Sequence, residues 1–134
     1  MIPSRSEDHP LRTDEDVVRM RQAVRGLAKE MGFSLVDQTK LVTAASELGR
    51  NAVVYGGGGS ARLDTLLGGP RPGLRLLVSD DGPGIPDLEL ALRDGYTSGN
   101  GLGLGLSGSR RLMDEFRIDT APGAGTRVEI VKWK

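Results

Sequence analysis

The sequence contains no cysteine, which excludes both a disulfide framework and a thiolate metal site. Its one histidine, His9, lies in a polar N-terminal stretch between prolines, where it is a poor candidate for a catalytic triad. Neither sign of charge is in excess, because 18 Lys and Arg residues balance 18 Asp and Glu residues. Nucleic-acid and membrane-surface binders usually carry a basic excess, so we expect neither a nucleic acid nor a membrane as partner.

Long apolar runs and aromatic residues are also scarce. No run approaches the roughly 18 apolar residues of a membrane-spanning helix, and Met1 to Asp8 lacks the apolar core of a signal peptide. We therefore expect a cytoplasmic protein. With only 1 Trp, 2 Tyr and 2 Phe in 134 residues, the core must consist mainly of Leu and Val, and the length suits a single domain.

The first half of the chain shows helical spacing of apolar residues. Residues 1–12 have no such period and are expected to be a flexible, extended or mobile segment, which leaves one domain over residues 13–134. A helix is predicted from a cap at Thr13 or Asp14 to a stop at Gly32, and a second from Ser34 or Asp37 onwards. The second helix would end at the four glycines 56–59, which predict an unusually loose exit.

The second half changes to the alternation typical of strands. It predicts a hairpin over residues 60–80, a short helix over 87–93, a helix over 105–115, and strands over 116–120 and 126–133. Because the strands follow one another as hairpins and the helices are segregated, the fold class is α+β. We expect a two-layer sandwich, with an antiparallel or mixed sheet covered by helices on one face and wet or partner-bound on the other.

Glycine and leucine alternate over the segment from Gly99 to Gly105. Glycines at 99, 101, 103 and 105 are separated by Asn100, Leu102 and Leu104. Each glycine inside a regular element costs about 0.5–1 kcal/mol relative to alanine, so four of them indicate a backbone that bends, moves or approaches a ligand. A glycine loop that opens into a helix N-terminus can hold phosphate. A mobile loop without a ligand is the alternative.

Glu47 and Asn51 lie four positions apart in the second predicted helix. This spacing puts both side chains on one face of the helix, about 5–6 Å apart at Cβ. The amide oxygen of Asn51 is a hard ligand that suits Mg²⁺, and the carboxylate of Glu47 can take a proton from an attacking hydroxyl. An exposed polar pair without chemistry explains the spacing as well.

Asp80 ends a predicted strand and is followed by Gly82 and Gly84. A carboxylate in this place can accept a hydrogen bond from the exocyclic amine of a nucleotide base, while the glycines let the backbone approach the ring. Turn geometry alone also explains Asp, Pro and Gly here. The same two interpretations apply to Gly125 and Thr126, because the threonine hydroxyl could contact a phosphate or Asp80.

Familiar phosphate-binding motifs are missing. The sequence has no Gly-x-x-x-x-Gly-Lys-Ser/Thr loop and neither the His-Arg-Asp nor the Asp-Phe-Gly motif of eukaryotic-type protein kinases. If the chain binds a nucleotide phosphate, a different architecture must hold it.

Taken together, four segments resemble the GHKL, or Bergerat-fold, ATPases. Glu47-Leu48-Gly49-Arg50-Asn51 resembles their N box, Asp80 to Gly84 their G1 box and Gly99 to Gly105 their G2 box. Gly125-Thr126 sits where their last nucleotide-contacting element falls. The small size and the segment from Asp80 to Phe116 are most similar to the anti-sigma-factor-type serine/threonine kinases, and among them to stressosome switch kinases. The resemblance covers roughly residues 13–134.

The resemblance implies roles for particular residues. Glu47 would be catalytic and polarise the attacking hydroxyl, and Asn51 would ligate Mg²⁺. Asp80 would accept from the adenine amino group in a pocket shaped by Gly82 and Gly84. The remaining cofactor-binding residues would be Gly99, Gly101, Leu102, Gly103, Leu104, Gly105 and Thr126. Arg50 could neutralise phosphate or face a partner.

The resemblance further implies a reaction with ATP and Mg²⁺. The γ-phosphate would pass to a serine or threonine of a STAS-domain protein, and the released kinase would activate a PP2C-type phosphatase. Two alternatives are an anti-sigma factor that binds a sigma factor directly and a non-catalytic ATP-dependent binding module. A homodimer is left open.

Overall fold

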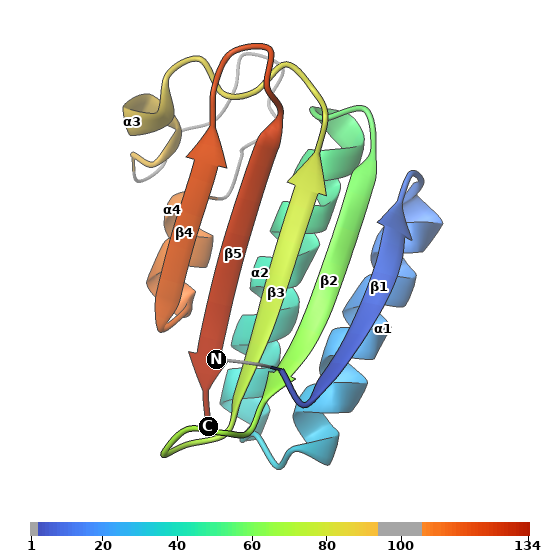
Figure 1. Ribbon diagram of the computed structural model, residues 1–134, viewed down its shortest axis with the longest axis vertical. Coiled ribbons are helices and arrows are strands. Elements are labelled where there is room, and N and C mark those ends of the chain that lie inside the picture. The colour runs from blue at the N-terminus through green and yellow to red at the C-terminus, as the bar shows by residue number, and fades with distance from the viewer. Residues whose placement is uncertain (1–2, 94–105) are drawn as a thin grey trace.

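The computed structural model describes residues 3–93 and 106–134. Its elements follow the chain in this order: β1 (Arg5–Leu11), α1 (Asp14–Glu30), α2 (Leu35–Val54), β2 (Gly59–Leu66), β3 (Gly73–Asp80), α3 (Leu88–Ala91), α4 (Leu106–Leu112), β4 (Glu115–Thr120) and β5 (Thr126–Trp133). The strands form one sheet in the order β1-β2-β3-β5-β4, and every neighbouring pair is antiparallel. The predicted two-layer α+β sandwich is confirmed, with α1, α2 and α4 behind the sheet (Figure 1).

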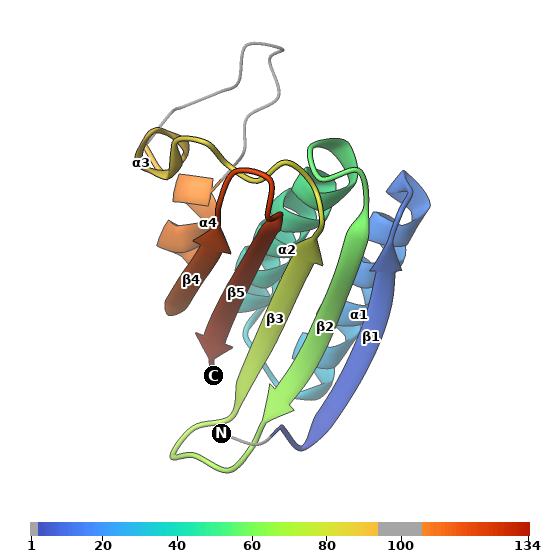
Figure 2. The ribbon, with the colours of Figure 1, turned by 45° about the horizontal axis from the view of Figure 1, so that its top comes forward.

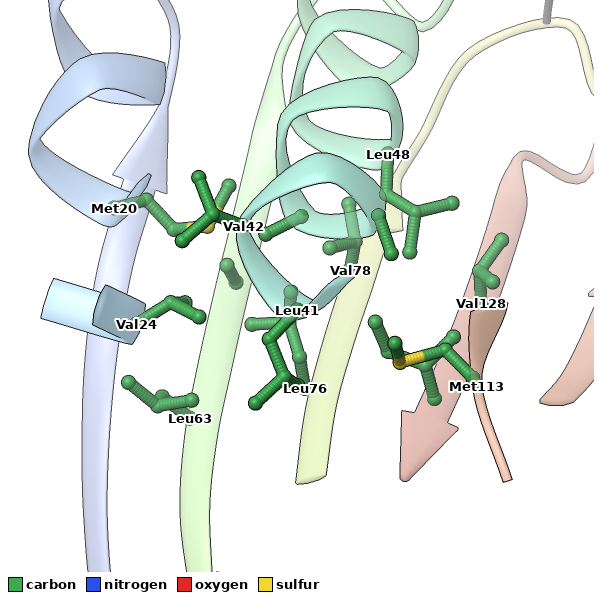
Figure 3. Close-up of a cluster of buried hydrophobic side chains, with 14 of the residues drawn as sticks. Met20, Val24, Leu41, Val42, Leu48, Leu63, Leu76, Val78, Met113 and Val128 are labelled. Carbon is green, nitrogen blue, oxygen red and sulfur yellow. The ribbon is translucent and has the colours of Figure 1, made fainter. Parts of the chain in front are cut away.

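Strand register explains why one face of the sheet is apolar. Leu63 of β2 pairs with Leu76 of β3, which pairs with Ile130 of β5, which in turn pairs with Phe116 of β4. This row faces the helices, where Met20 and Val24 of α1, Leu41 and Leu48 of α2, and Met113 after α4 meet it (Figure 3). The core is therefore mainly aliphatic, as the small number of aromatic residues predicted.

The opposite face of the sheet carries charged side chains that pair across strands. Asp64 of β2, only 3% exposed, accepts hydrogen bonds from Arg75 Nη2 at 2.9 Å and from Ser6 Oγ at 2.6 Å. Arg62 approaches the same carboxylate at 3.5 Å. Three donors around one carboxylate compensate its burial, and the face as a whole agrees with the predicted wet side.

Two sequence predictions are corrected by these elements. Of the extended or mobile segment expected over residues 1–12, Arg5–Leu11 are extended and form edge strand β1, which pairs with β2 along its whole length, so the flexible alternative is wrong there. Its side chains are mostly polar, so the sequence shows no strand-like alternation of apolar residues. The predicted helix over 105–115 instead ends at Leu112, and Glu115 already belongs to β4.

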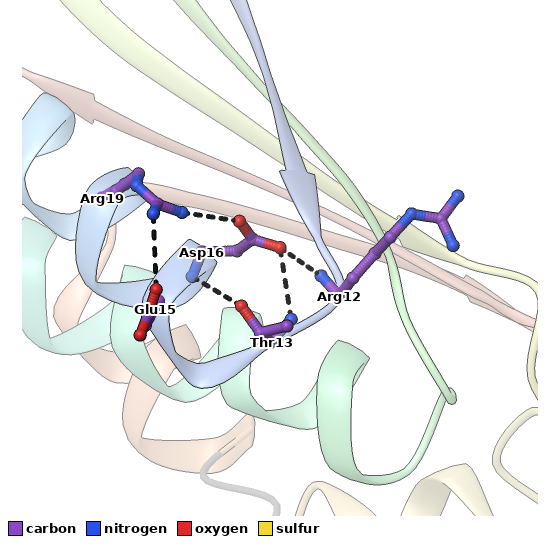
Figure 4. A network of polar contacts seen from close by, with 5 residues as sticks. All are labelled: Arg12, Thr13, Glu15, Asp16 and Arg19. Atoms are coloured by element: carbon purple, nitrogen blue, oxygen red, sulfur yellow. Dashed lines mark hydrogen bonds and ion pairs between the residues drawn. The ribbon is translucent and has the colours of Figure 1, made fainter.

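Helix α1 begins with a reciprocal capping arrangement at Thr13 (Figure 4). The Thr13 hydroxyl accepts from Asp16 N at 3.2 Å, while the Asp16 carboxylate accepts from Thr13 N at 3.2 Å and Arg12 N at 2.9 Å. The hydrogen bond from Arg12 N is the main reason that the pKa of Asp16 lies below its ordinary value. Caps of this kind contribute about 1 kcal/mol, and this one fixes the turn from β1 into α1.

The predicted boundaries of the other helices are close to those observed. Ser34 is the N-cap of α2, Asp87 is the N-cap of α3, and Gly32 follows α1 with φ +84°. Within the described ranges 3–93 and 106–134, no helix combines the length and apolar character needed to cross a membrane.

Candidate nucleotide-binding site

Five segments at one end of the strands supply the lining of a pocket. They are the C-terminal end of α2, the end of β3, the loop after β3, the start of α4 and the start of β5, and Figures 1 and 2 show where these elements lie. Of the predicted site residues, Asn51, Asp80, Gly84 and Thr126 all line this pocket. The other lining residues are mostly small or apolar: Leu48, Ala52, Tyr55, Gly56, Val78, Pro83, Ile85, Leu106 and Val128.

Asp80 provides the carboxylate in this mostly apolar wall. Burial raises the pKa of Asp80, hydrogen bonds from the backbone N–H groups of Gly82 and Thr126 lower it in part, and the charge of Asp81 raises it. Gly82 N lies 2.9 Å from Asp80 Oδ1. The net result is a pKa above the ordinary value of 3.8. Asp80 is thus a half-buried acceptor that receives hydrogen bonds from two backbone donors.

Gly84 gives the loop after β3 its path into the pocket. Its φ is +76°, a conformation that residues with a Cβ rarely adopt, and an added Cβ would run into the carbonyl of Ala121. Gly82 is outside the pocket lining, and an added Cβ there would be 2.6 Å from Gly56 Cα. Both predicted glycines are therefore required by close backbone contacts, Gly84 in the pocket lining and Gly82 against Gly56.

Gly56 belongs to the site although the sequence suggested only a loose helix exit. A Cβ at this position would collide with the carboxyl carbon of Asp80, and it would lie 2.6 Å from Asp80 Cβ and 2.7 Å from Ala52 O. Gly59 is equally confined, against the backbone of Ser79. The expectation of a loose segment is therefore wrong at both positions. The signal was the glycine itself, because a glycine can mark the close approach of another backbone as well as flexibility.

Replacing Gly56 with alanine should push the Asp80 carboxylate out of position. We expect the affinity for ATP to fall about tenfold, the equivalent of one lost hydrogen bond, because the methyl group occupies the space behind that carboxylate. Isothermal titration calorimetry would measure the change. Gly57→Ala is not a clean control because its φ is +71°, whereas Gly26→Ala on α1 meets no atom within 4 Å and should leave the affinity unchanged. Equal affinity in both variants would contradict the role assigned to Gly56.

Helix α2 carries both members of the predicted Glu47 and Asn51 pair. Asn51 lines the pocket, while Glu47 is half-buried one helical turn earlier and outside the pocket lining. Arg50, between them, is exposed. The pocket wall thus carries the amide of Asn51 and the carboxylate of Asp80, while the carboxylate of Glu47 lies outside the lining. The predicted glycine-rich segment from Gly99 to Gly105, with Leu102 and Leu104, lies outside the described residues.

The described part of the pocket offers one hard oxygen ligand that suits Mg²⁺, the amide of Asn51. The described residues contain no group of three or more His, Cys, Asp or Glu side chains suited to hold a metal ion. Asn51 supplies a hard oxygen ligand in the pocket, and Mg²⁺ commonly takes few protein ligands and completes its shell with phosphates and water. The described residues therefore fit a Mg²⁺ that binds together with nucleotide phosphates.

Comparison with known proteins agrees with this geometry. The family model of the histidine kinase-, DNA gyrase B- and HSP90-like ATPases matches residues 36–134. Serine/threonine-protein kinase RsbT of Bacillus subtilis (strain 168) is 43% identical over 121 residues, which cover 90% of this chain and 91% of that protein. Anti-sigma F factor of Bacillus licheniformis is 29% identical over 119 residues, 84% of this chain and 80% of that protein.

The fold has a solved counterpart as well. A crystal structure of the RsbU and RsbW domains of a Mycobacterium tuberculosis protein matches 97% of this chain with a TM-score of 0.67 and 23% sequence identity. This chain spans only 32% of that longer one. At this identity the likeness shows the fold alone, and it agrees with the sandwich described above.

The chain belongs to the histidine kinase-, DNA gyrase B- and HSP90-like (GHKL) ATPases, whose family model covers most of its length. Its identity to RsbT places it among the anti-sigma-factor-type serine/threonine kinases of that family. Both resemblances drawn from the sequence are confirmed. ATP use and protein partners follow from this membership.

Proposed function

We propose that the chain transfers the γ-phosphate of ATP to a serine or threonine of a STAS-domain partner. The observation that carries the proposal is the convergence of Asn51, Asp80 and Thr126 on one pocket, with Glu47 one helical turn from Asn51. The base would enter the apolar part of the pocket and donate its amino group to Asp80. The phosphates would then extend past Asn51 towards Glu47.

Phosphoryl transfer depends mainly on positioning and charge neutralisation. The acceptor hydroxyl oxygen forms a bond to the γ-phosphorus, the bond from that phosphorus to the bridging oxygen breaks, and ADP leaves with the electron pair. Glu47 would orient the hydroxyl and take its proton, directly or through water. Mg²⁺, held by Asn51, would neutralise charge on the phosphates. Residues 99–105, which resemble the G2 box, would contact the phosphates.

The same reaction would act as a switch between partners. A phosphate adds about two negative charges to the acceptor at neutral pH, and a complex formed with the neutral hydroxyl would be weakened by repulsion or misfit. The released kinase would then bind and activate a PP2C-type phosphatase in the cytoplasm. The family membership gives the kinase class, and this proposal adds the particular partners of a stressosome.

The test is a phosphorylation assay with labelled ATP, Mg²⁺ and candidate STAS-domain proteins, followed by mapping of the modified residue. We expect label on one serine or threonine of the acceptor and loss of the kinase complex after modification. ATP binding without transfer to any STAS-domain protein would favour a non-catalytic binding module instead.

A direct anti-sigma factor is the second candidate function, because anti-sigma F factors are among the relatives. The two candidate functions predict that different proteins co-purify with the chain from its own cells. Co-purification with a sigma factor would support the second candidate, and co-purification with STAS-domain proteins and a phosphatase would support the first.

A further inference from the structure

The hydroxyl of Thr120, at the end of β4, joins three segments around the pocket. Thr120 Oγ1 accepts a hydrogen bond from Ile85 N at 2.9 Å and donates one to Gly125 O at 3.0 Å. It also lies 2.9 Å from Thr126 Oγ1. One part-buried oxygen thus connects β4 with the loop after β3 and the start of β5.

These contacts fix the direction of each proton. A threonine hydroxyl has one proton and two lone pairs. Gly125 O is a carbonyl and can only accept, so it takes the proton of Thr120, while Ile85 N can only donate and takes one lone pair. The second lone pair must then receive the proton of Thr126. With its proton committed, Thr126 presents only lone pairs to other partners.

Thr126 borders the same pocket as Asp80. Its side chain lies on the helix-covered face of the sheet, like that of Val128 two residues later, and it pairs in register with Asp80 of β3. The carboxylate of Asp80 is itself an acceptor and already receives hydrogen bonds from two backbone donors. The base end of the pocket therefore offers acceptors on both strands.

We propose that Thr120 is a positioning residue that selects the base. By holding the Thr126 hydroxyl as an acceptor, it favours a purine with an amino group at C6, as in adenine, and disfavours one with a carbonyl there, as in guanine. Without the Thr120 hydroxyl, Thr126 could rotate and donate to that carbonyl. The inference rests on the proposed binding of the ATP base in this pocket.

The experiment compares the dissociation constants of Mg-ATP and Mg-GTP by calorimetry. In Thr120→Val, the ratio of the GTP constant to the ATP constant should fall about tenfold, the equivalent of one misdirected hydrogen bond. Thr120→Ser keeps the hydroxyl and should keep the ratio. Thr39→Val is the matched control, because that hydroxyl donates to Leu35 O at 3.0 Å on the exposed side of α2.

If Thr120 had a merely structural role, Thr120→Val would weaken the binding of both nucleotides equally. The ratio of the two dissociation constants would then be unchanged, which would overturn the proposal. Loss of discrimination in folded Thr120→Ser would overturn it too. Thr126→Val removes the acceptor itself and gives a second measurement if Thr120→Val does not fold; the ratio should fall there as well, and an unchanged ratio would count against the proposal. Failure of the wild-type chain to bind ATP would refute the proposed function instead.

Discussion

Replacing Glu47 with alanine should reduce phosphoryl transfer to a protein acceptor by a factor of about 10²–10⁴ and leave the affinity for ATP nearly unchanged. A positioned general base contributes a rate factor of this size. Glu47 lies on α2 outside the pocket lining, so its loss should remove little that contacts the bound nucleotide. Single-turnover transfer from labelled ATP and calorimetric titration with ATP measure the two effects separately.

Two further variants make the Glu47 experiment specific. Glu47→Gln keeps the size and polarity of the side chain but not its basicity, so it should lose nearly as much transfer as Glu47→Ala. Glu30→Ala removes a carboxylate from the exposed end of α1, where its side chain is 68% exposed, and should have no effect. Unchanged transfer in Glu47→Ala would show that Glu47 is not the base.

Replacing Asp80 with asparagine should weaken ATP binding about 10- to 100-fold. The carboxylate is a half-buried acceptor in the pocket lining, and hydrogen bonds to charged groups contribute about 1.5–3 kcal/mol. An amide oxygen could still accept from Gly82 N and Thr126 N, so the local backbone should persist. Asp81→Asn changes the neighbouring exposed carboxylate and serves as the control. Equal affinity of Asp80→Asn and wild type would rule out the assigned contact.

The same substitution should raise the free energy of unfolding near neutral pH. Because burial raises the pKa of Asp80, the folded state binds this proton more tightly than the unfolded state does. The ionised group therefore destabilises the fold above its raised pKa, and this cost disappears as the pH falls below the ordinary value of 3.8. Urea unfolding of the wild type and of Asp80→Asn, once near neutral pH and once below pH 3.8, measures this cost. The gain in Asp80→Asn should be present near neutral pH and absent at the acid end.

Much of the fold and part of the site could be predicted from the sequence because they depend on local spacing. The period of the apolar residues gives α1 and α2, and the alternation gives the hairpin of β2 and β3. Strand β1 escapes this logic, since an edge strand with charged and polar side chains is held by backbone pairing with β2. Along β1 the exposure of the side chains alternates, but their hydrophobicity does not.

Some residues of the candidate site could also be predicted from the sequence, and others could not. Asp80 and Asn51 are recognisable because their residue types and neighbours are distinctive. Gly56 and Thr120 are not, because their importance comes from contacts with residues 24 and 35 positions away in the chain, respectively Asp80 and Ile85. In the sequence, a glycine after a helix suggests a flexible backbone, and a threonine at the end of a strand suggests only a preference for β-structure. Tertiary contacts decide both roles.

The placement of β5 between β3 and β4 has a consequence for biosynthesis. The pocket takes Asn51 from the first half of the chain but Thr126 and Val128 from the last strand described. A nascent chain on the ribosome can pair β2 with β3, yet β4 has no neighbour in the sheet until β5 has emerged. The nucleotide site therefore forms late, and incomplete translation products should not compete with the finished kinase for ATP.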